Sequence, residues 1–180
     1  MSRGQAERLL PLLEEVLAAA GTGWSGIGAI GVGIGPGNFT GIRVAVAAAR
    51  GLALSLGIPA EGVNLAEAHA DGRDVVTCLP APRGAVVLGR GAELHRLEEN
   101  ALSDPAAWPG GDAWNRPLVG PAAEVVACAT GRPLGAEADW LPALARIAAG
   151  RAAAGRPRPA PLYLRPADAA PPADLPPVIL

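Results

Sequence analysis

A glycine-rich stretch offers the most distinctive chemistry in this 180-residue sequence, and its residues of interest are Gly35, Pro36, Gly37, Phe39, Thr40 and Gly41. It follows an expected strand and opens an expected helix, so the first amides of that helix could hold an anion such as a phosphate. The alternative is a structural turn in which the glycines permit close packing. A glycine loop alone is a weak signal, and the absence of lysine excludes a Walker-type phosphate site.

Other candidates for catalysis or metal binding are sparse. His69 and His95 lack the spacing of a helical His-x-x-x-His metal pair. Cys78 and Cys128 have no metal-like spacing either, and we expect both to be small buried side chains in a reducing cytoplasm. Composition leaves a Ser/His/acid triad open, although no serine lies in a nucleophile-elbow context. We therefore assign no catalytic residue and no metal site.

Composition bounds the class of protein. Half of the residues are hydrophobic, which favours a packed core over disorder. Aromatic residues make up only 3%, the formal net charge is −2 and the pI is about 5.7. These values argue against a surface that binds tRNA or DNA on its own. Every long apolar run is interrupted by arginine, glycine or proline, so we expect no membrane span and a cytoplasmic protein.

Hydrophobic periodicity predicts a βαβ unit preceded by a helix. The first helix ends before Gly21, and Pro11 should kink it or lie in its first turns. A strand at residues 30–34, a helix at residues 39–56 capped by Asn38 or Thr40, and a short strand from residue 60 follow. Two strands joined through a helix are expected to be parallel.

The rest of the chain has a different texture. We expect a hairpin with strands at residues 74–82 and 84–97, followed by an irregular connection at residues 100–117. A strand end at residues 117–120 and two helices at residues 121–131 and 139–155 come next. The chain ends in a proline-rich tail with one extended piece at residues 162–165. A sheet of two strands is unstable alone. Either the second half adds strands to it, or strands are missing ahead of Met1.

The helix at residues 39–56 is apolar almost all round, so it must be covered on more than one side. A sheet covers one side. A partner subunit is the favoured cover for the other, and the alternative is a single core closed by the first helix. Arg43 and Arg50 share one face, either as solvated charges or as partners of Glu14 or Glu15 of a neighbour. The predicted interface residues are Leu9, Leu10, Leu13, Val16, Leu17, Arg43, Val46 and Arg50.

Three blocks carry a family resemblance: ERLLPLLEEVL, GIGPGNFTGIRVAVAAARGLALSLGIPAEGV and PLYLR, in this order. In these blocks the chain resembles the TsaB (YeaZ) family of bacterial tRNA threonylcarbamoyladenosine biosynthesis proteins. The likeness is strong over residues 7–63 and weaker over residues 139–165. The GPGxFTGxR pattern is its most specific part, with Asn38 where the family usually has serine.

The resemblance implies an α/β protein of the actin-like ATPase, ribonuclease-H-like architecture with two lobes. We expect a truncated first lobe at residues 1–68 and a second lobe with the proline-rich tail at residues 69–180. Family members are not enzymes themselves. They pair with the TsaD-type catalytic subunit, work with the TsaE-type ATPase, and form homodimers through the same helical face. Their complex adds a threonylcarbamoyl group to adenosine 37 of tRNA.

The resemblance therefore implies that this chain meets tRNA only through the complex and binds no cofactor alone, with ATP or ADP left open at the subunit junction. The alternative is a stand-alone nucleotide-binding enzyme or hydrolase that uses the glycine-rich loop. The chain departs from the family by lacking an N-terminal AIDTA-like strand, for which we favour a misplaced start or a truncation. In the block PAPRGAVV, Pro80 and Val87 replace an acid and a tyrosine, while Arg83 and Gly84 are kept.

Overall fold

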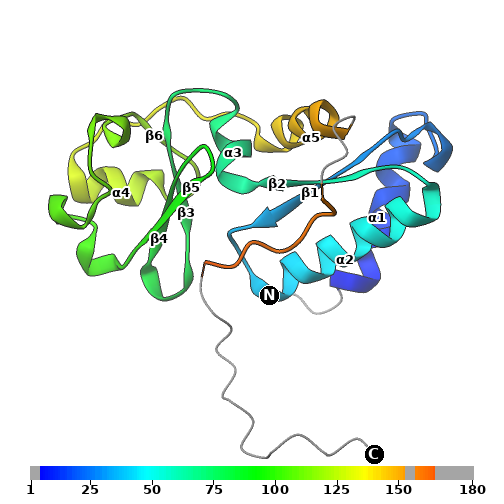
Figure 1. The fold of residues 1–180 in the computed structure, drawn as a ribbon, viewed down its shortest axis with the longest axis horizontal. Coiled ribbons are helices and arrows are strands. Elements are labelled where there is room, and N and C mark those ends of the chain that lie inside the picture. Colours follow the sequence, from blue (N-terminus) through cyan, green and yellow to red (C-terminus); the bar gives the residue numbers. More distant parts are fainter. Residues whose placement is uncertain (1–4, 153–156, 165–180) are drawn as a thin grey trace, which may run out of the picture.

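A parallel βαβ unit forms the centre of the first half of the chain. The computed structural model of the protein describes residues 5–152 and 157–164. The unit consists of β1 (Ile30–Gly35), α2 (Phe39–Leu56) and β2 (Ala60–Asn64) (Figure 1). Strands β1 and β2 pair in parallel as a two-stranded sheet. The predicted order and direction of these elements are confirmed.

Helix α2 begins and ends where its capping residues require. The side chain of Asn38 accepts a hydrogen bond of 2.8 Å from the amide of Gly41. Gly57 ends the helix in the left-handed conformation, with φ of 67°. Between these ends, Val46 and Ala49 pack with Val32 of β1 in one hydrophobic cluster. The inner face of α2 is therefore a core face.

The opposite face of β1 is made of glycine. A Cβ atom built on Gly31 would lie 2.7 Å from Cβ of Ala148, and one built on Gly33 would lie 3.0 Å from Cδ2 of Leu65. Ala148 belongs to helix α5 (Trp140–Arg151). The alternating glycines of β1 thus permit a helix to approach its backbone closely, as the sequence pattern indicates.

A second, four-stranded sheet forms from the middle of the chain in the order β5-β4-β3-β6. Its strands are β3 (Val76–Pro80), β4 (Val86–Arg90), β5 (Glu93–Leu97) and β6 (Leu118–Val119). The second strand of the expected hairpin is wrong in detail, because a turn at Gly91 divides it into β4 and β5. Helix α4 (Ala123–Thr130) packs on this sheet through Val126. The second half therefore builds its own sheet.

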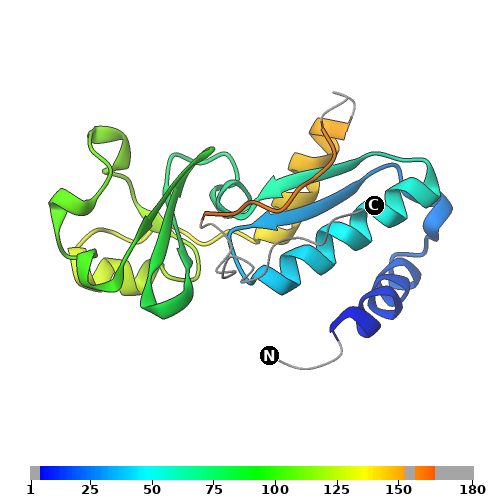
Figure 2. The ribbon, with the colours of Figure 1, turned by 60° about the horizontal axis from the view of Figure 1, so that its bottom comes forward.

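Helix α1 (Gln5–Ala19) lies on the α2 side of the first lobe (Figures 1 and 2). It continues through Pro11. None of the side chains at residues 6–19 is buried. Short 3₁₀ turns complete the connections at η1 (Trp24–Gly26), η2 (Pro82–Gly84), η3 (Glu99–Ala101), η4 (Pro105–Ala107) and η5 (Asp112–Trp114).

The two lobes meet at α5 and at helix α3 (Leu65–Ala70), a six-residue helix that the sequence analysis did not predict. Helix α5 lies against β1, β2 and α3, although it follows the second lobe in the sequence. Arg151 forms an ion pair of 2.8 Å with Glu67 across this contact. The expected boundary between residues 68 and 69 falls inside α3.

Residues 157–164, which we call the C-terminal strap, run alongside β1 in both views (Figures 1 and 2). The amide of Leu162 donates a hydrogen bond of 2.8 Å to the carbonyl of Ile34. The predicted extended piece thus lies beside β1 at Leu162 without forming a strand, and a bend follows at Leu164. The tail from residue 165 onward lies outside the described residues.

Burial changes the pKa of His69, which lies where the two lobes meet. The His69 ring on α3 stacks on Trp140 of α5, with ring centroids 5.7 Å apart. Burial lowers the pKa of His69 below its ordinary value of 6.5, and the charge of Glu137 opposes this effect. The folded state therefore binds a proton at His69 less readily than the unfolded state does.

We expect stability to decrease as the pH falls from 7 to about 5, since the unfolded chain takes up the proton first. The stability associated with the neutral His69 ring is fully present above pH 6.5 and is lost as the pH falls through the lowered pKa of His69. Urea unfolding at a series of pH values should show a flatter profile for His69→Gln. The control is His95→Gln, and equal profiles for the two variants would contradict the prediction.

Val46 and Leu54 separate the two faces of α2, being 3% and 78% exposed. Val46→Ala removes two methyl groups from the core, so we expect a loss of about 2 kcal/mol in the free energy of unfolding. Leu54→Ala should change it by less than about 0.5 kcal/mol. Chemical denaturation of both variants measures the difference, and similar losses would show that the outer face of α2 is covered within the monomer.

Candidate partner surface and glycine turn

The glycine turn packs against the chain's own C-terminal strap. Gly35 has φ of 112°, which favours glycine. A Cβ atom there would lie 3.0 Å from Cδ1 of Ile42 and 3.3 Å from the carbonyl oxygen of Leu162. The Gly35–Pro36 peptide bond is cis. Close approach of the strap is therefore one physical reason for a glycine at this turn.

The start of α2 already has an internal acceptor. The Asn38 side chain binds the amide of Gly41, and the Asn38 carbonyl accepts from the amide of Ile42 at 2.9 Å. An anion at this helix start would have to compete with Asn38 for the same amide. These contacts favour the structural-turn alternative over a phosphate site.

Arg43 joins the first turn of α2 to the strap. Its guanidinium carbon lies 3.7 Å from the centre of the Phe39 ring, and its Nε donates a hydrogen bond of 2.7 Å to the hydroxyl of Tyr163. The rings of Phe39 and Tyr163 are themselves 5.2 Å apart. We call Phe39, Arg43 and Tyr163 the strap cluster. Tyr163 was not among the predicted site residues, because only the folded chain brings it to α2.

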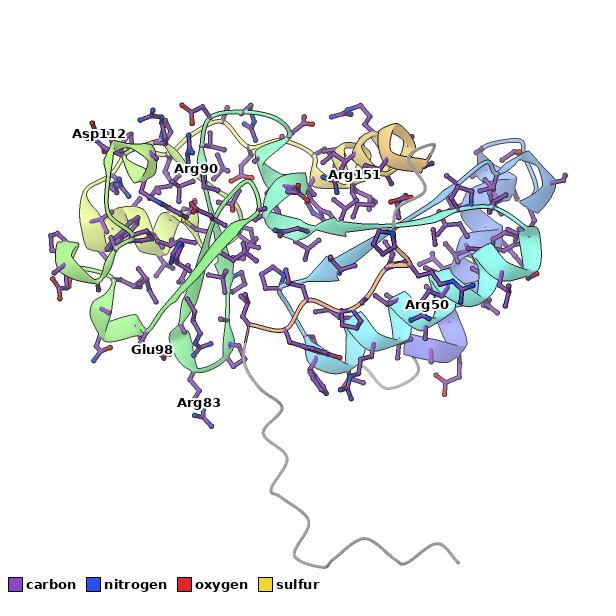
Figure 3. The ribbon with its side chains drawn as sticks, in the orientation of Figure 1. Arg50, Arg83, Arg90, Glu98, Asp112 and Arg151 are labelled. Carbon is purple, nitrogen blue, oxygen red and sulfur yellow. The ribbon has the colours of Figure 1, made fainter. Side chains whose placement is uncertain are left out.

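The second arginine of the predicted pair behaves differently. Arg50 extends from α2 without a hydrogen-bond or ion-pair partner in the described ranges 5–152 and 157–164 (Figure 3). Of the two acids considered for it, Glu15 is held by Arg8 of its own helix at 2.8 Å. Arg50 and Glu14 therefore have no ion-pair partner among the described residues.

An apolar surface remains exposed on α1 and α2, and we call it the helical face. Its large exposed side chains are Leu10, Leu12, Val16 and Leu54, with exposed fractions of 49%, 47%, 57% and 78%. The other predicted interface residues of α1, Leu9, Leu13 and Leu17, are half-buried. Periodicity predicts an apolar side of α1, but only the fold shows which of its side chains remain exposed.

One predicted interface residue needs correction. Val46 is 3% exposed and belongs to the cluster between α2 and β1. It packs inside the lobe and is not available to a partner. Leu12 and Leu54 were not among the predicted interface residues, although both have large exposed apolar side chains.

Helix α2 is also long and apolar enough to cross a membrane by length and composition, with a mean hydropathy of 1.4. Its arginines and glycines interrupt the apolar run, and on that ground the sequence predicts no membrane span. The same length and composition occur in core helices of folded proteins, and the inner residues Val46, Ala49 and Ala53 are buried here. The composition of α2 is therefore weak evidence for a membrane span.

The loop of residues 80–87 and the two cysteines lie in the second lobe. Val87 is buried, and Arg83 extends from the η2 turn with φ of 65° (Figure 3). Burial raises the pKa of Cys78 to about 12, which keeps it a thiol. The expectation of burial is wrong for Cys128, which is exposed. Within the described residues no three His, Cys, Asp or Glu side chains gather as a metal site.

The two α/β lobes, with a parallel βαβ unit in the first, place the chain among proteins of the actin-like, ribonuclease-H-like ATPase fold. A family model described as TsaD, tRNA N6-adenosine threonylcarbamoyltransferase, matches residues 1–129, and the chain belongs to this family.

Its solved relatives include two structures from Pseudomonas aeruginosa. One is an uncharacterized protein with similarity to peptidase YeaZ, with a TM-score of 0.66 and 26% identity over 91% of this chain and 85% of that one. The other is YeaZ, with a TM-score of 0.63 and 27% identity over 91% of this chain and 86% of that one.

A curated relative is the tRNA threonylcarbamoyladenosine biosynthesis protein TsaB of Escherichia coli strain K12. It is 39% identical over 70 residues, which is 39% of this chain and 30% of the relative. The match thus spans less than a third of that relative. Together these similarities make the chain a TsaB/YeaZ-like member of the family.

The strap cluster predicts an energetic coupling between α2 and the C-terminal strap. In a double-mutant cycle of Arg43→Gln and Tyr163→Phe, we expect a coupling of about 0.5–1 kcal/mol in the free energy of unfolding. The matched cycle of Arg50→Gln and Tyr163→Phe should be additive, since Arg50 is not part of the cluster. Additivity in both cycles would show that the strap is not held by Arg43.

Proposed function

We propose that this chain is a non-catalytic subunit in the biosynthesis of threonylcarbamoyladenosine in tRNA. It docks through the helical face of α1 and α2 onto a TsaD-type catalytic subunit. It works in the cytoplasm with a TsaE-type ATPase and meets tRNA only through the assembled complex. The names and matches of its relatives support the process, and the uncovered helical face supports the docking role.

The exposure of the helical face is the observation that carries this proposal. Burying the large apolar side chains on α1 and α2 lowers the free energy by about 25 cal/mol for each Å² of apolar surface removed from water. Leu54 is 78% exposed on a helix whose other side is core. A surface of this kind is typical of a site that another protein covers.

Charges at the same surface can select the partner. Arg50 and Glu14 extend from neighbouring helices without partners in the described part of the chain. Opposite charges on a partner would orient docking and raise the association rate more than the affinity. Without the catalytic subunit, a second copy of the chain covers the helical face in our proposal.

Two exposed valines on helices provide the test. Val16 on α1 is 57% exposed and Val125 on α4 is 59% exposed. Val16→Glu places a charge in the proposed interface, so we expect binding to the catalytic subunit to weaken at least about tenfold. Val125→Glu should bind as the wild type does. Titration of the purified TsaD-type subunit measures the affinity, and reconstituted tRNA modification measures the activity.

Unfolding of each variant is measured first, since both substitutions lie on the surface and should leave stability within about 0.5 kcal/mol. If Val16→Glu retained both partner binding and modification, the helical face would not be the docking site. Light scattering of the isolated variants reports the homodimer, which Val16→Glu should shift to monomer.

A further inference from the structure

A cavity of about 380 Å³ lies in the second lobe. Its walls come from the irregular segment between β5 and β6 and from the end of α4, and they include Leu102, Ser103, Trp108, Trp114, Ala129 and Arg132. Asp112 of η5 marks this end of the molecule, and Arg50 marks the helical face at the other (Figure 3). The cavity is therefore separate from the proposed docking surface.

Both indole rings of the cavity are held in place. Trp114 is 5% exposed and packs against the His95 ring in a T-shaped arrangement, with centroids 4.9 Å apart. The indole nitrogen of Trp108 donates a hydrogen bond of 2.9 Å to the carbonyl of Leu102. Since this bond uses the polar atom of Trp108, the ring offers apolar surface to the cavity. Rigid aromatic walls favour a ligand with a flat, apolar body.

Arg132 is the cation of the cavity. Its guanidinium lies 4.4 Å from the centre of the Trp108 ring. Its Nη2 donates to the carbonyl of Trp114 and to the side chain of Asn115. Its Nη1 is buried and has no hydrogen-bond partner in the described structure. None of the cavity's lining residues is acidic. A positive group thus stands in the wall with one nitrogen unsatisfied.

We propose that this cavity binds a small carboxylate with a planar, apolar body. Nη1 of Arg132 is buried in this structure, so the side chain turns toward the cavity to donate a hydrogen bond to the carboxylate, which satisfies that nitrogen. The body lies between the walls formed by Trp108 and Trp114. A single arginine matches the charge of a carboxylate, whereas a phosphate dianion would keep an unpaired charge in a partly apolar site.

Ala129 allows the cavity to be filled without removing any of these contacts. It lines the cavity from the exposed side of α4. Ala129→Phe would occupy the space of the ligand body. Val125 lies on the same helix but outside the cavity lining and is 59% exposed. Val125→Phe is therefore the matched control for adding a ring to α4.

Calorimetric titration of the full chain with indole-3-acetate and with the neutral indole-3-acetamide tests the proposal. We expect saturable binding of the acid and at least about tenfold weaker binding of the amide. Ala129→Phe should weaken binding of the acid at least about tenfold, and Val125→Phe should leave it unchanged. Urea unfolding of both variants confirms that they fold.

Four results would overturn the proposal: no saturable binding of the acid, equal affinities for acid and amide, binding that survives Ala129→Phe, or an equal loss in Val125→Phe. Binding of the acid does not depend on partner docking. Val16→Glu alters the opposite lobe, so this variant should bind the acid as the wild type does.

Discussion

The alternation of side chains along β1 is the constraint on which the first lobe depends. Val32 and its neighbours at every second position face α2, while Gly31 and Gly33 face α5 and α3. A Cβ atom on Gly31 would lie 2.7 Å from Cβ of Ala148, so α5 reaches the sheet only because this face carries no side chains. The two-stranded sheet is thereby enclosed between two helices that lie far apart in the sequence, α2 and α5.

This enclosure decides which side of α2 remains outside. The inner side is committed to β1 through Val46, and the first turn is tied to the strap through Arg43 and Tyr163. Helix α1 lies nearby, yet none of its own side chains at residues 6–19 is fully buried. The outer side with Leu54 is therefore left to solvent by the order of the sheet and helices. The helical face is a consequence of the fold, since no covering element in residues 5–152 or 157–164 reaches it.

Local signals predicted local structure well. Asn38 and Gly57 mark the ends of α2, and the glycines of β1 indicated the close approach of another segment. The errors come from contacts between distant residues. Helix α3 is too short for a periodic pattern, and the inward direction of Val46 depends on which side of α2 the sheet lies. Tyr163 reaches Arg43 only because the strap returns to β1, and such a return has no signature in either segment alone.

The two proposed sites differ in shape, and the shape of each decides what can bind there. Leu10, Leu12 and Val16 stand on the outer surface of a helix, where a small molecule would leave most of their area in water. Only a second protein can cover such a surface and gain from the apolar area it removes from water. Trp108 and Trp114 instead line a cavity of about 380 Å³, which admits a small ligand and no protein element as wide as a helix. A partner on one lobe and a small molecule in the other would therefore not compete for the same residues.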